Sequence, residues 1–379
     1  MTAYDTSRFL IYGASGFTGT LTARRAVEWG MRPVLGGRDD RAVSALAAEL
    51  GLESRIAPLT DPGALDGMLE GVDVLLNCVG PPTVVPPLVQ AALRTGTHYL
   101  DIAGDCEYVY SLDRQAEAAQ VVLCPMAGYD LVPNDVLATR LQELLPDATH
   151  VDVGVLAGGA SQGSSETVLV LLRDKGTQVR EDGLLRMVPF GSRRLSFDGP
   201  DGRHDGYLFP FPDPYTLWRS TGIPNIAAYV SSPGLSAATV RVTRWVEPRL
   251  TNRTVFRLAR WGARRRPSVN RTGEPADQRS LVWARVRNGR GGTVEGWIET
   301  PPGYGSTAAL SLLCARRLLT GNHPVGACTP ASLVDLDAVL GLPGFRGSAN
   351  LAPPGRSGRG SGSEWSRGVI GVVATPDGD

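Results

Sequence analysis

Three glycines at a spacing of three residues constrain the fold of this chain most strongly. Gly13, Gly16 and Gly19 stand after the apolar segment 8–12 and open the helical pattern of 18–29. Glycines between a strand and a helix permit a tight turn, a close approach of backbone to a pyrophosphate, and close helix–strand packing. Free N–H groups at the start of the helix then bind phosphate oxygens. The segment therefore predicts a dinucleotide-binding loop, with a purely structural turn as the alternative. The residues expected to contact the cofactor are Gly13, Ser15, Gly16, Phe17, Thr18 and Gly19.

The first third of the chain repeats the order strand then helix. Short apolar runs alternate with segments whose apolar residues recur at helical spacing. Six strands with intervening helices predict an α/β fold, a Rossmann-type doubly wound parallel sheet. The predicted strands are 8–12, 33–35, 55–59, 72–77, 97–102 and 121–125, and the predicted helices are 18–29, 41–50, one that opens at Asp61, 84–94 and 108–119.

The end of the second predicted strand bears on the choice between NAD and NADP. NAD sites usually place an acidic residue there, where it binds the ribose hydroxyls. This chain has Arg38 at that point, followed by Asp39 and Asp40. A guanidinium can bind a 2′-phosphate through two parallel hydrogen bonds. Arg38 therefore predicts NADP(H) as the cofactor. The two acids keep NADH, or a surface ion pair with Arg38, as alternatives.

Two more loops follow predicted strands at the same edge of the sheet. In doubly wound folds the carboxyl edge holds the nicotinamide half of the cofactor and the substrate. One loop follows 72–77 and the other follows 97–102. Asp101 and Asp105 in the second loop fit helix capping as well as they fit acid–base chemistry. The residues of these loops expected to contact the cofactor are Asn77, Cys78, Val79, Gly80, Pro81 and Gly104.

After residue 128 the alternation of strand and helix ends. The region predicts a second, α+β domain that binds substrate, because helical segments are followed by a long turn-rich stretch with strand-like runs. Asn134 is interpreted as the N-cap of a helix over 134–145. The later predicted elements are strand 150–156, helix 167–172, strand-like 207–214 and 240–243, a hairpin of 281–287 and 293–298, and helix 307–319.

Composition excludes several classes of protein. Lys+Arg and Asp+Glu both number 38, so the net charge is zero, and we expect no nucleic-acid partner. The absence of a long apolar run and the polar first residues predict no integral membrane segment and no secretory signal. Five cysteines without CxxC spacing and four histidines without HxH predict no metal site and a cytoplasmic location. Lysine occurs once, at Lys175, so Schiff-base chemistry would need that residue.

With these motifs in hand, the chain resembles the saccharopine dehydrogenase-like NAD(P)-dependent oxidoreductases. Within them it is most similar to the trans-acting enoyl reductases of lipid and polyketide pathways, and the resemblance spans roughly residues 8–345. The matching segments are IYGASGFTG (11–19), LGGR (35–38), LLNCVGPP (75–82), THYLDIAGD (97–105), AGYDLVPNDV (127–136), GGASQGSS (158–165), TGIPNIAAY (221–229), PPGYGSTAALSLLCARRLL (301–319) and GACTPASLV (326–334).

The resemblance implies NADP(H) without flavin, a discontinuous architecture and a homodimer formed through the sheet of the second domain. It carries over no catalytic residue set. It implies a biosynthetic substrate, either a small molecule or an acyl or polyketide chain on an acyl carrier protein. The expected units are an NADP-binding Rossmann domain (1–128), a substrate and dimerisation domain (129–305), a C-terminal helix that packs back on the first domain (306–345) and a flexible tail (346–379).

Hydride transfer from NADPH needs an acceptor held at the nicotinamide and a proton donor. Tyr129 follows the sixth predicted strand and is the first candidate for the donor, with Asp130 or Asn134 to orient the substrate. Packing between domains is the alternative role of Tyr129. Tyr304 is a second candidate donor.

Two segments of the second domain have unusual composition. Aromatic residues and prolines crowd 207–218, which predicts either an acyl pocket or lid, or a packed loop. Nine arginines and one glutamate fall in 241–266. That segment fits an acidic carrier protein, a membrane surface, or simply a solvated arginine face.

These observations favour an NADPH-dependent reductase that transfers hydride to C=C, or to C=N or C=O, of a biosynthetic intermediate. Two alternatives stay open. An opine- or imine-type amino-acid dehydrogenase predicts a compact polar pocket with an arginine for the carboxylate. A non-catalytic NADP-sensing protein predicts a nicotinamide face blocked by protein.

Overall fold

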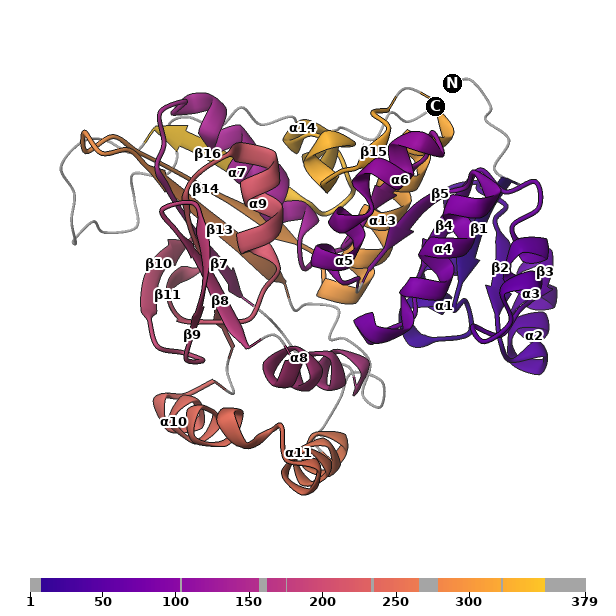
Figure 1. Ribbon diagram of the computed structural model, residues 1–379. Helices are drawn as coiled ribbons and strands as arrows, with labels where there is room; N and C mark the ends of the chain where they lie inside the picture. Colours follow the sequence, from indigo (N-terminus) through magenta and orange to yellow (C-terminus); the bar gives the residue numbers. More distant parts are fainter. Residues whose placement is uncertain are drawn as a thin grey trace.

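The computed structural model describes residues 8–102, 104–156, 162–174, 176–232, 235–265, 279–321 and 323–351. Figure 1 shows two sheets, each with its own helices, and a central helix between them. The first sheet contains β1 (Phe9–Tyr12), β2 (Val34–Gly37), β3 (Ser54–Ile56), β4 (Val74–Asn77), β5 (His98–Asp101), β6 (Val122–Cys124) and β15 (Gly326–Ala327). Its helical segments are α1 (Phe17–Glu28), α2 (Asp40–Leu50), α3 (Pro62–Met68), η2 (Pro82–Val84), α4 (Pro86–Thr95), α5 (Cys106–Ser111) and α6 (Asp113–Ala118).

The second sheet contains β7 (His150–Leu156), β8 (Thr177–Glu181), β9 (Leu184–Val188), β10 (Arg194–Gly199), β11 (Gly202–Leu208), β12 (Asn225–Ser231), β13 (Ser280–Arg287), β14 (Thr293–Thr300) and β16 (Arg346–Leu351). The other helical segments are α7 (Val132–Leu144), α8 (Gln162–Asp174), α9 (Asp213–Thr221), α10 (Ala237–Val246), η3 (Glu247–Arg249), α11 (Arg253–Arg265), α13 (Gly303–Leu319), η4 (Pro330–Ser332) and α14 (Leu336–Leu340).

The first sheet confirms the predicted doubly wound architecture. Its strand order is β15-β6-β5-β4-β1-β2-β3, and every neighbouring pair is parallel. The order reverses between β1 and β4, and the crevice at such a switch point is where ligands bind in this class of fold. The glycine loop after β1 and the loop after β4 therefore meet at one edge.

Two elements of this domain differ from the sequence interpretation. The predicted helix 108–119 is two short helices, α5 and α6, because the chain bends at Leu112. A seventh strand, β15, was not predicted, because it has two residues and reaches the sheet only after the whole second domain.

The second sheet is mixed and has nine strands. The predicted hairpin is confirmed as β13 and β14, which pair from Ser280 with Thr300 to Arg287 with Thr293. Helices α7 and α9 pack against this sheet, and Figure 1 shows both of them on the same side of it.

Three interpretations in this region were wrong. The strand-like run 240–243 lies in α10, where Ser236 caps the helix and Val240 packs inward. Asn134 lies inside α7 rather than at its cap, because the helix begins at Val132. Residues Arg346–Leu351, predicted as the start of a tail, form β16, which supplies an edge strand beside β14.

Helix α13 joins the two halves of the molecule. It packs against α1, β4 and β5 of the first domain, and its residues Leu310, Leu312 and Cys314 are fully buried. One hydrophobic cluster runs from Ile11 of β1 through Leu310 to Val153 of β7. This shared core positions the second domain over the carboxyl edge of the first sheet.

Candidate functional site

The glycine loop has a backbone that only glycine accommodates at two positions. Gly13 has a φ of 80°, and a Cβ there would collide with the Val79 side chain. A Cβ on Gly19 would collide with the carbonyl oxygen of Gly13. The loop after β1 thus presses against the loop after β4 on one side and against α1 on the other. This is the close packing that a pyrophosphate cradle needs.

Helix α1 begins without a side-chain cap. Gly16 holds the N-cap position, and no side chain accepts from the first-turn N–H groups. The neighbouring helices α2, α3 and α5 are each capped by an aspartate: Asp39, Asp61 and Asp105. Uncapped N–H groups at a helix start bind anions, so α1 offers the free donors that a phosphate takes up.

Arg38 lies exposed directly after β2, at the same edge of the sheet. Asp39 uses its carboxylate to accept from the backbone N–H of Ala42, at 3.1 Å, and Asp40 accepts from Ser44, at 2.9 Å. Within the described part of the chain, no hydrogen bond or ion pair engages the Arg38 side chain. The guanidinium is near Tyr12, since its charge opposes the rise that burial causes in the pKa of that phenol.

The loop after β4 is held by Asn77. Its side-chain oxygen accepts from the N–H of Val79 at 2.8 Å, and its amide nitrogen donates to the Tyr99 hydroxyl at 3.1 Å. Asn77 is fully buried, so the structure places it behind the loop rather than on the cofactor side. The peptide bond between Gly80 and Pro81 is cis.

Cys78 is the thiol of this loop that reaches the open edge. Burial raises its pKa to about 12, and a hydrogen bond with Thr22 opposes that rise. The thiol is therefore neutral near pH 7, which makes it a poor nucleophile. Gly104, the last predicted cofactor residue, lies where a Cβ would collide with the carboxylate of Asp101.

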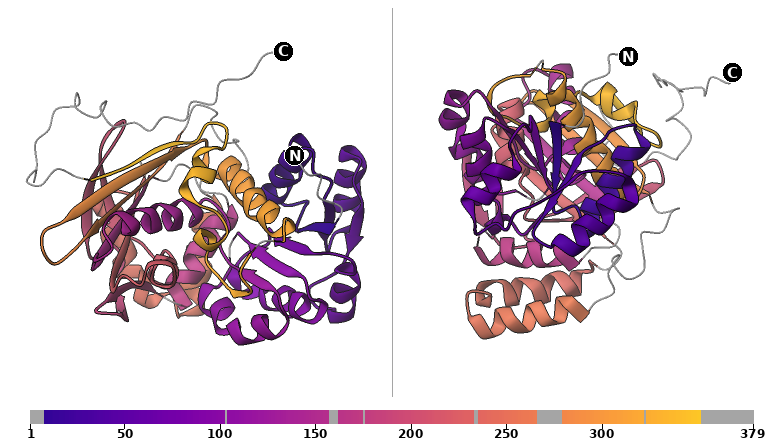
Figure 2. Two further views of the ribbon diagram at one scale, coloured as in Figure 1. Left: turned by 90° about the horizontal axis from the view of Figure 1, so that it is seen from above. Right: turned by 90° about the vertical axis from the view of Figure 1, so that its right-hand side faces the viewer.

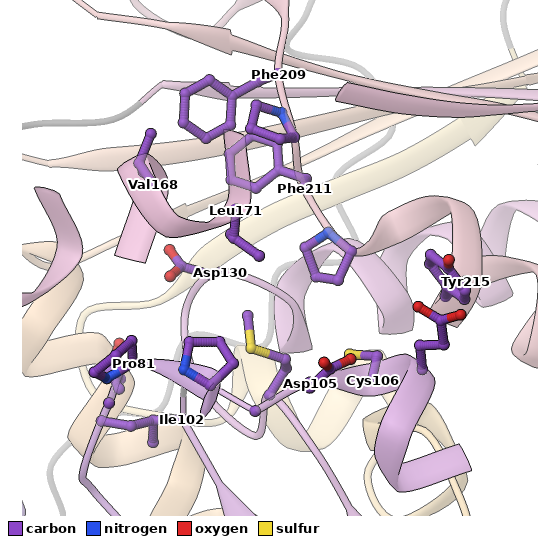
Figure 3. A pocket seen from close by; sticks show the side chains of 18 of the residues that line it. Pro81, Ile102, Asp105, Cys106, Asp130, Val168, Leu171, Phe209, Phe211 and Tyr215 are labelled. Carbon is purple, nitrogen blue, oxygen red and sulfur yellow. The ribbon is translucent and has the colours of Figure 1, made fainter. Parts of the chain in front are cut away.

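A cavity of about 270 Å³ opens beside these loops, and Figure 3 shows its side chains from close by. Six separate parts of the chain contribute most of its lining: the loops after β4, β5 and β6, helix α8, the segment 209–215, and the start of α13. Its apolar lining includes Ile102, Met126, Val168, Leu171, Phe209 and Phe211. The prediction of an apolar pocket from the aromatic segment 207–218 is thereby supported for residues 209–215.

Asp130 is the predicted catalytic residue that the structure brings to this cavity. Figure 3 shows its carboxyl group among Leu171, Pro81 and Ile102. The side chain is accessible from the cavity, and protein surrounds it on its other sides. This burial raises the pKa of Asp130 from the ordinary 3.8 to about 6.

Tyr129 and Asn134 point elsewhere. The Tyr129 hydroxyl donates towards the carbonyl oxygens of Leu281, at 3.4 Å, and Leu156, at 3.5 Å, in the second sheet. Asn134 is fully buried, and its amide donates to Asp213 at 2.9 Å. Neither belongs to the cavity lining. The Tyr129 contacts reach the second sheet, and the Asn134 contact joins α7 to α9 within the second domain. Both suit a packing role.

Of three further cavity residues, the sequence interpretation had singled out one and missed two. Tyr304 was a candidate and does line the cavity, where its ring meets Phe17 of the glycine loop at a centroid distance of 5.2 Å. Thr307 and Leu171 were not singled out, because each sits in an ordinary helical pattern. Lys175, which any Schiff-base mechanism would need, lies outside the described residues.

The first domain and the overall fold both have known relatives. Residues 9–124 match the family model described as the saccharopine dehydrogenase NADP binding domain. The chain as a whole resembles saccharopine dehydrogenase (L-Glu forming) from Saccharomyces cerevisiae, with a TM-score of 0.60 over 90% of this chain and 99% of that chain, at 14% identity. At that identity the likeness concerns the fold alone.

Several curated relatives carry the name trans-acting enoyl reductase, among them one from Mycobacterium leprae and one from Mycobacterium tuberculosis. The protein from Mycobacterium leprae is 34% identical over 153 residues, which are 37% of each chain. A relative from Mycobacterium tuberculosis is 30% identical over 146 residues, 35% of this chain and 34% of its own length. The chain thus matches little more than a third of the length of these relatives.

The residues of the NADP-binding domain fit a dinucleotide phosphate. The glycine cradle and the uncapped α1 suit the pyrophosphate, and Arg38 is placed for the 2′-phosphate. The loop of Cys78, Gly80 and Pro81 belongs to this domain and lines the cavity. A nicotinamide bound beyond that loop would face the apolar space. The site therefore combines a glycine loop with an uncapped helix, an apolar cavity and one carboxyl group of raised pKa.

Proposed function

We propose that the protein is an NADPH-dependent reductase that transfers hydride to a C=C bond of an acyl-type substrate. The observation that carries the proposal is the apolar cavity at the nicotinamide side of the cofactor cradle, with Asp130 inside it. The names of the relatives support the bond type, since they are called enoyl reductases.

The lining of the cavity argues against the amino-acid dehydrogenase alternative. Its described titratable residues include the acids Asp105, Glu107 and Asp130, and neither arginine nor lysine is among them. An amino-acid substrate needs a cation for its carboxylate. The same cavity argues against a purely NADP-sensing protein, because an open space rather than packed protein adjoins the loop of Gly80.

The chain's own residues divide the proposed reaction between them. Arg38 and the first turn of α1 hold the cofactor phosphates, and bound NADPH supplies the hydride. Leu171, Phe209 and Phe211 hold the acyl chain and exclude water. Asp130 delivers a proton to the carbon next to the one that accepts the hydride, so the double bond becomes a single bond and the carboxyl group becomes a carboxylate.

The test measures NADPH oxidation by the purified chain with two substrate sets. One set holds enoyl thioesters of increasing chain length, and the other pairs a keto acid with an amino acid. We expect turnover with the thioesters that improves with chain length, and none with the second set. Asp130→Asn should lower kcat about a hundredfold, the usual contribution of a positioned general acid, with NADPH affinity unchanged.

Glu143→Gln, which replaces an exposed carboxylate far along α7, serves as the control. Turnover of the keto acid pair alone would refute the acyl assignment. Full activity of Asp130→Asn would refute the role of that carboxyl group. Presenting the best acyl chain on an acyl carrier protein and on a small thiol then tests the carrier-bound form of the substrate.

A further inference from the structure

Helices α10 and α11 carry the same five-residue pattern. Residues 241–245 read Arg-Val-Thr-Arg-Trp and residues 257–261 read Arg-Leu-Ala-Arg-Trp. Figures 1 and 2 show both helices at one end of the molecule, beyond α8. The pattern therefore occurs twice on one outlying part of the fold.

Each copy of the pattern turns an aliphatic residue and a tryptophan outward. Val242 and Trp245 are 62% and 63% exposed, and Leu258 and Trp261 are 63% and 55% exposed. In each pair the two residues are three positions apart and share one side of their helix. The opposite sides are the ones that pack inward, through Val240 in α10 and through Val255, Phe256 and Ala259 in α11. The outward apolar residues therefore do not belong to the hydrophobic core.

The same region is strongly basic. Eight arginines and one acid, Glu247, fall in residues 237–265. The Glu247 carboxylate is half-buried and accepts from the backbone N–H of Phe190 at 3.0 Å, so it is turned away from the outer surface. Arg241, Arg244 and Arg257 are exposed beside the tryptophans. A partner of this surface must offer both negative charge and an apolar region that the exposed side chains can enter.

We propose that the outward faces of α10 and α11 dock on an anionic lipid surface. Tryptophan and aliphatic side chains enter the boundary between headgroups and acyl chains, while arginines bind the lipid phosphates. The repetition favours a membrane over an acidic protein. A bilayer offers identical chemistry to both helices, whereas a folded protein offers each helix a different surface.

Helix α8 contacts the proposed docking surface and also lines the cavity. Helix α8 packs against α11, and it lines the cavity with Val168 and Leu171. Docking would therefore bring the apolar cavity close to the membrane. This consequence, a substrate drawn from the lipid phase, rests on the proposed function, while the docking itself does not.

The experiment is flotation of the full chain with lipid vesicles. One preparation contains phosphatidylcholine alone and the other contains phosphatidylcholine with phosphatidylglycerol. We expect flotation with the anionic vesicles that falls with added salt, and little with the neutral ones. Trp245→Ser with Trp261→Ser, and separately Arg241→Gln with Arg257→Gln, should each weaken binding about tenfold or more.

Matched variants elsewhere separate specific docking from general stickiness. Val325→Ser replaces an apolar residue that is 43% exposed, and Arg290→Gln replaces an arginine on the β13–β14 hairpin. Both should float like the unmodified chain. NADPH titration of every variant checks folding independently of membrane binding and of catalysis.

Three outcomes would overturn the proposal. The first is failure to float with anionic vesicles at low salt, and the second is equal flotation with both vesicle types. The third is flotation that the tryptophan and arginine variants leave unchanged. Loss of binding to an acidic carrier protein in those variants, without vesicle binding, would assign the surface to a protein instead.

Discussion

At the scale of single residues, we expect the preference for NADPH to depend on Arg38. The two neighbouring acids are already engaged by the N-terminal turn of α2, and this leaves the guanidinium free of them. A charge-assisted contact of this kind contributes about 1.5–3 kcal/mol. We therefore expect this one side chain to select between NADPH and NADH, and the glycines to provide space for either dinucleotide.

We predict that Arg38→Gln raises the Kd for NADPH about 10- to 100-fold and leaves the Kd for NADH nearly unchanged. Calorimetric titration with both cofactors measures this directly. Arg24→Gln, which breaks an exposed ion pair with Glu49, is the control and should bind both normally. An equal loss of NADPH and NADH affinity would contradict a contact with the 2′-phosphate.

The protonation of Asp130 sets a second residue-scale prediction. Its pKa of about 6 means that the carboxyl group is protonated below that pH and loses its proton above it. A group that must donate a proton is competent only in the first state. We predict that kcat/KM for an enoyl thioester falls as the pH rises through about 6, about tenfold per unit where no other step limits. A profile that rises through the same range would show that Asp130 acts as a base.

At the scale of elements, one buried polar pair links α7 to α9. Asn134 of α7 donates through its amide nitrogen to one carboxylate oxygen of Asp213 at the start of α9. The Asn134 amide oxygen and the other Asp213 oxygen have no hydrogen-bond partner among the described residues. Burial raises the pKa of Asp213 from the ordinary 3.8 to about 7. A proton on Asp213 would let the carboxyl group donate to the Asn134 carbonyl.

This pair makes the stability of the fold depend on pH. Between about pH 4 and pH 7 the folded chain holds a proton on Asp213 that the unfolded chain releases. The free energy of unfolding therefore declines as the pH rises through that range. We predict that Asp213→Asn, which keeps the geometry without the charge, raises the free energy of unfolding at pH 8 by at least about 1 kcal/mol.

Denaturant unfolding at several pH values checks this expectation. The gain from Asp213→Asn should shrink below pH 6 and vanish near pH 4, since the carboxyl group is then neutral in both states. Asp174→Asn, at the exposed end of α8, should show no such pH-dependent gain. A destabilised Asp213→Asn at pH 8 would mean that the buried carboxylate is needed as an anion.

At the scale of the whole molecule, the cavity depends on α8, α13 and the segment 209–215 closing over the first domain. Leu171 points into it from α8, as Figure 3 shows. We predict that Leu171→Gln raises KM for a long enoyl thioester about tenfold, because the polar amide removes the gain from burying the chain. The Kd for NADPH should not change.

Steady-state kinetics across chain lengths measures this effect, which should be smallest for the shortest thioester. The control Leu184→Ser, which replaces an exposed leucine on β9 with a polar residue, should leave KM unchanged. If Leu171→Gln leaves the long-chain KM unaltered, the acyl chain binds elsewhere.

No helix within the described ranges is long and apolar enough to cross a bilayer.

The local sequence determined the first domain. The glycine spacing and the alternation of apolar runs with helical patterns depend on backbone geometry and on neighbours a few residues away, and such short-range signals survive in the linear text. They predicted the parallel sheet, the cradle of Gly13 and Gly19, and Arg38 at the edge of β2. The same rule placed Asp130 at the carboxyl edge, because it follows a strand there, and its side chain lines the cavity.

Only the tertiary structure decided what faces the cavity. Tyr129 and Asp130 are adjacent in the sequence, yet one side chain bonds to carbonyls of the second sheet and the other enters the apolar space. The strands β15 and β16 pair with partners more than 40 residues away, so no local sequence pattern predicts them. Side-chain direction and long-range pairing depend on which surfaces meet when the two domains pack, and that choice is made by the whole core rather than by any one segment.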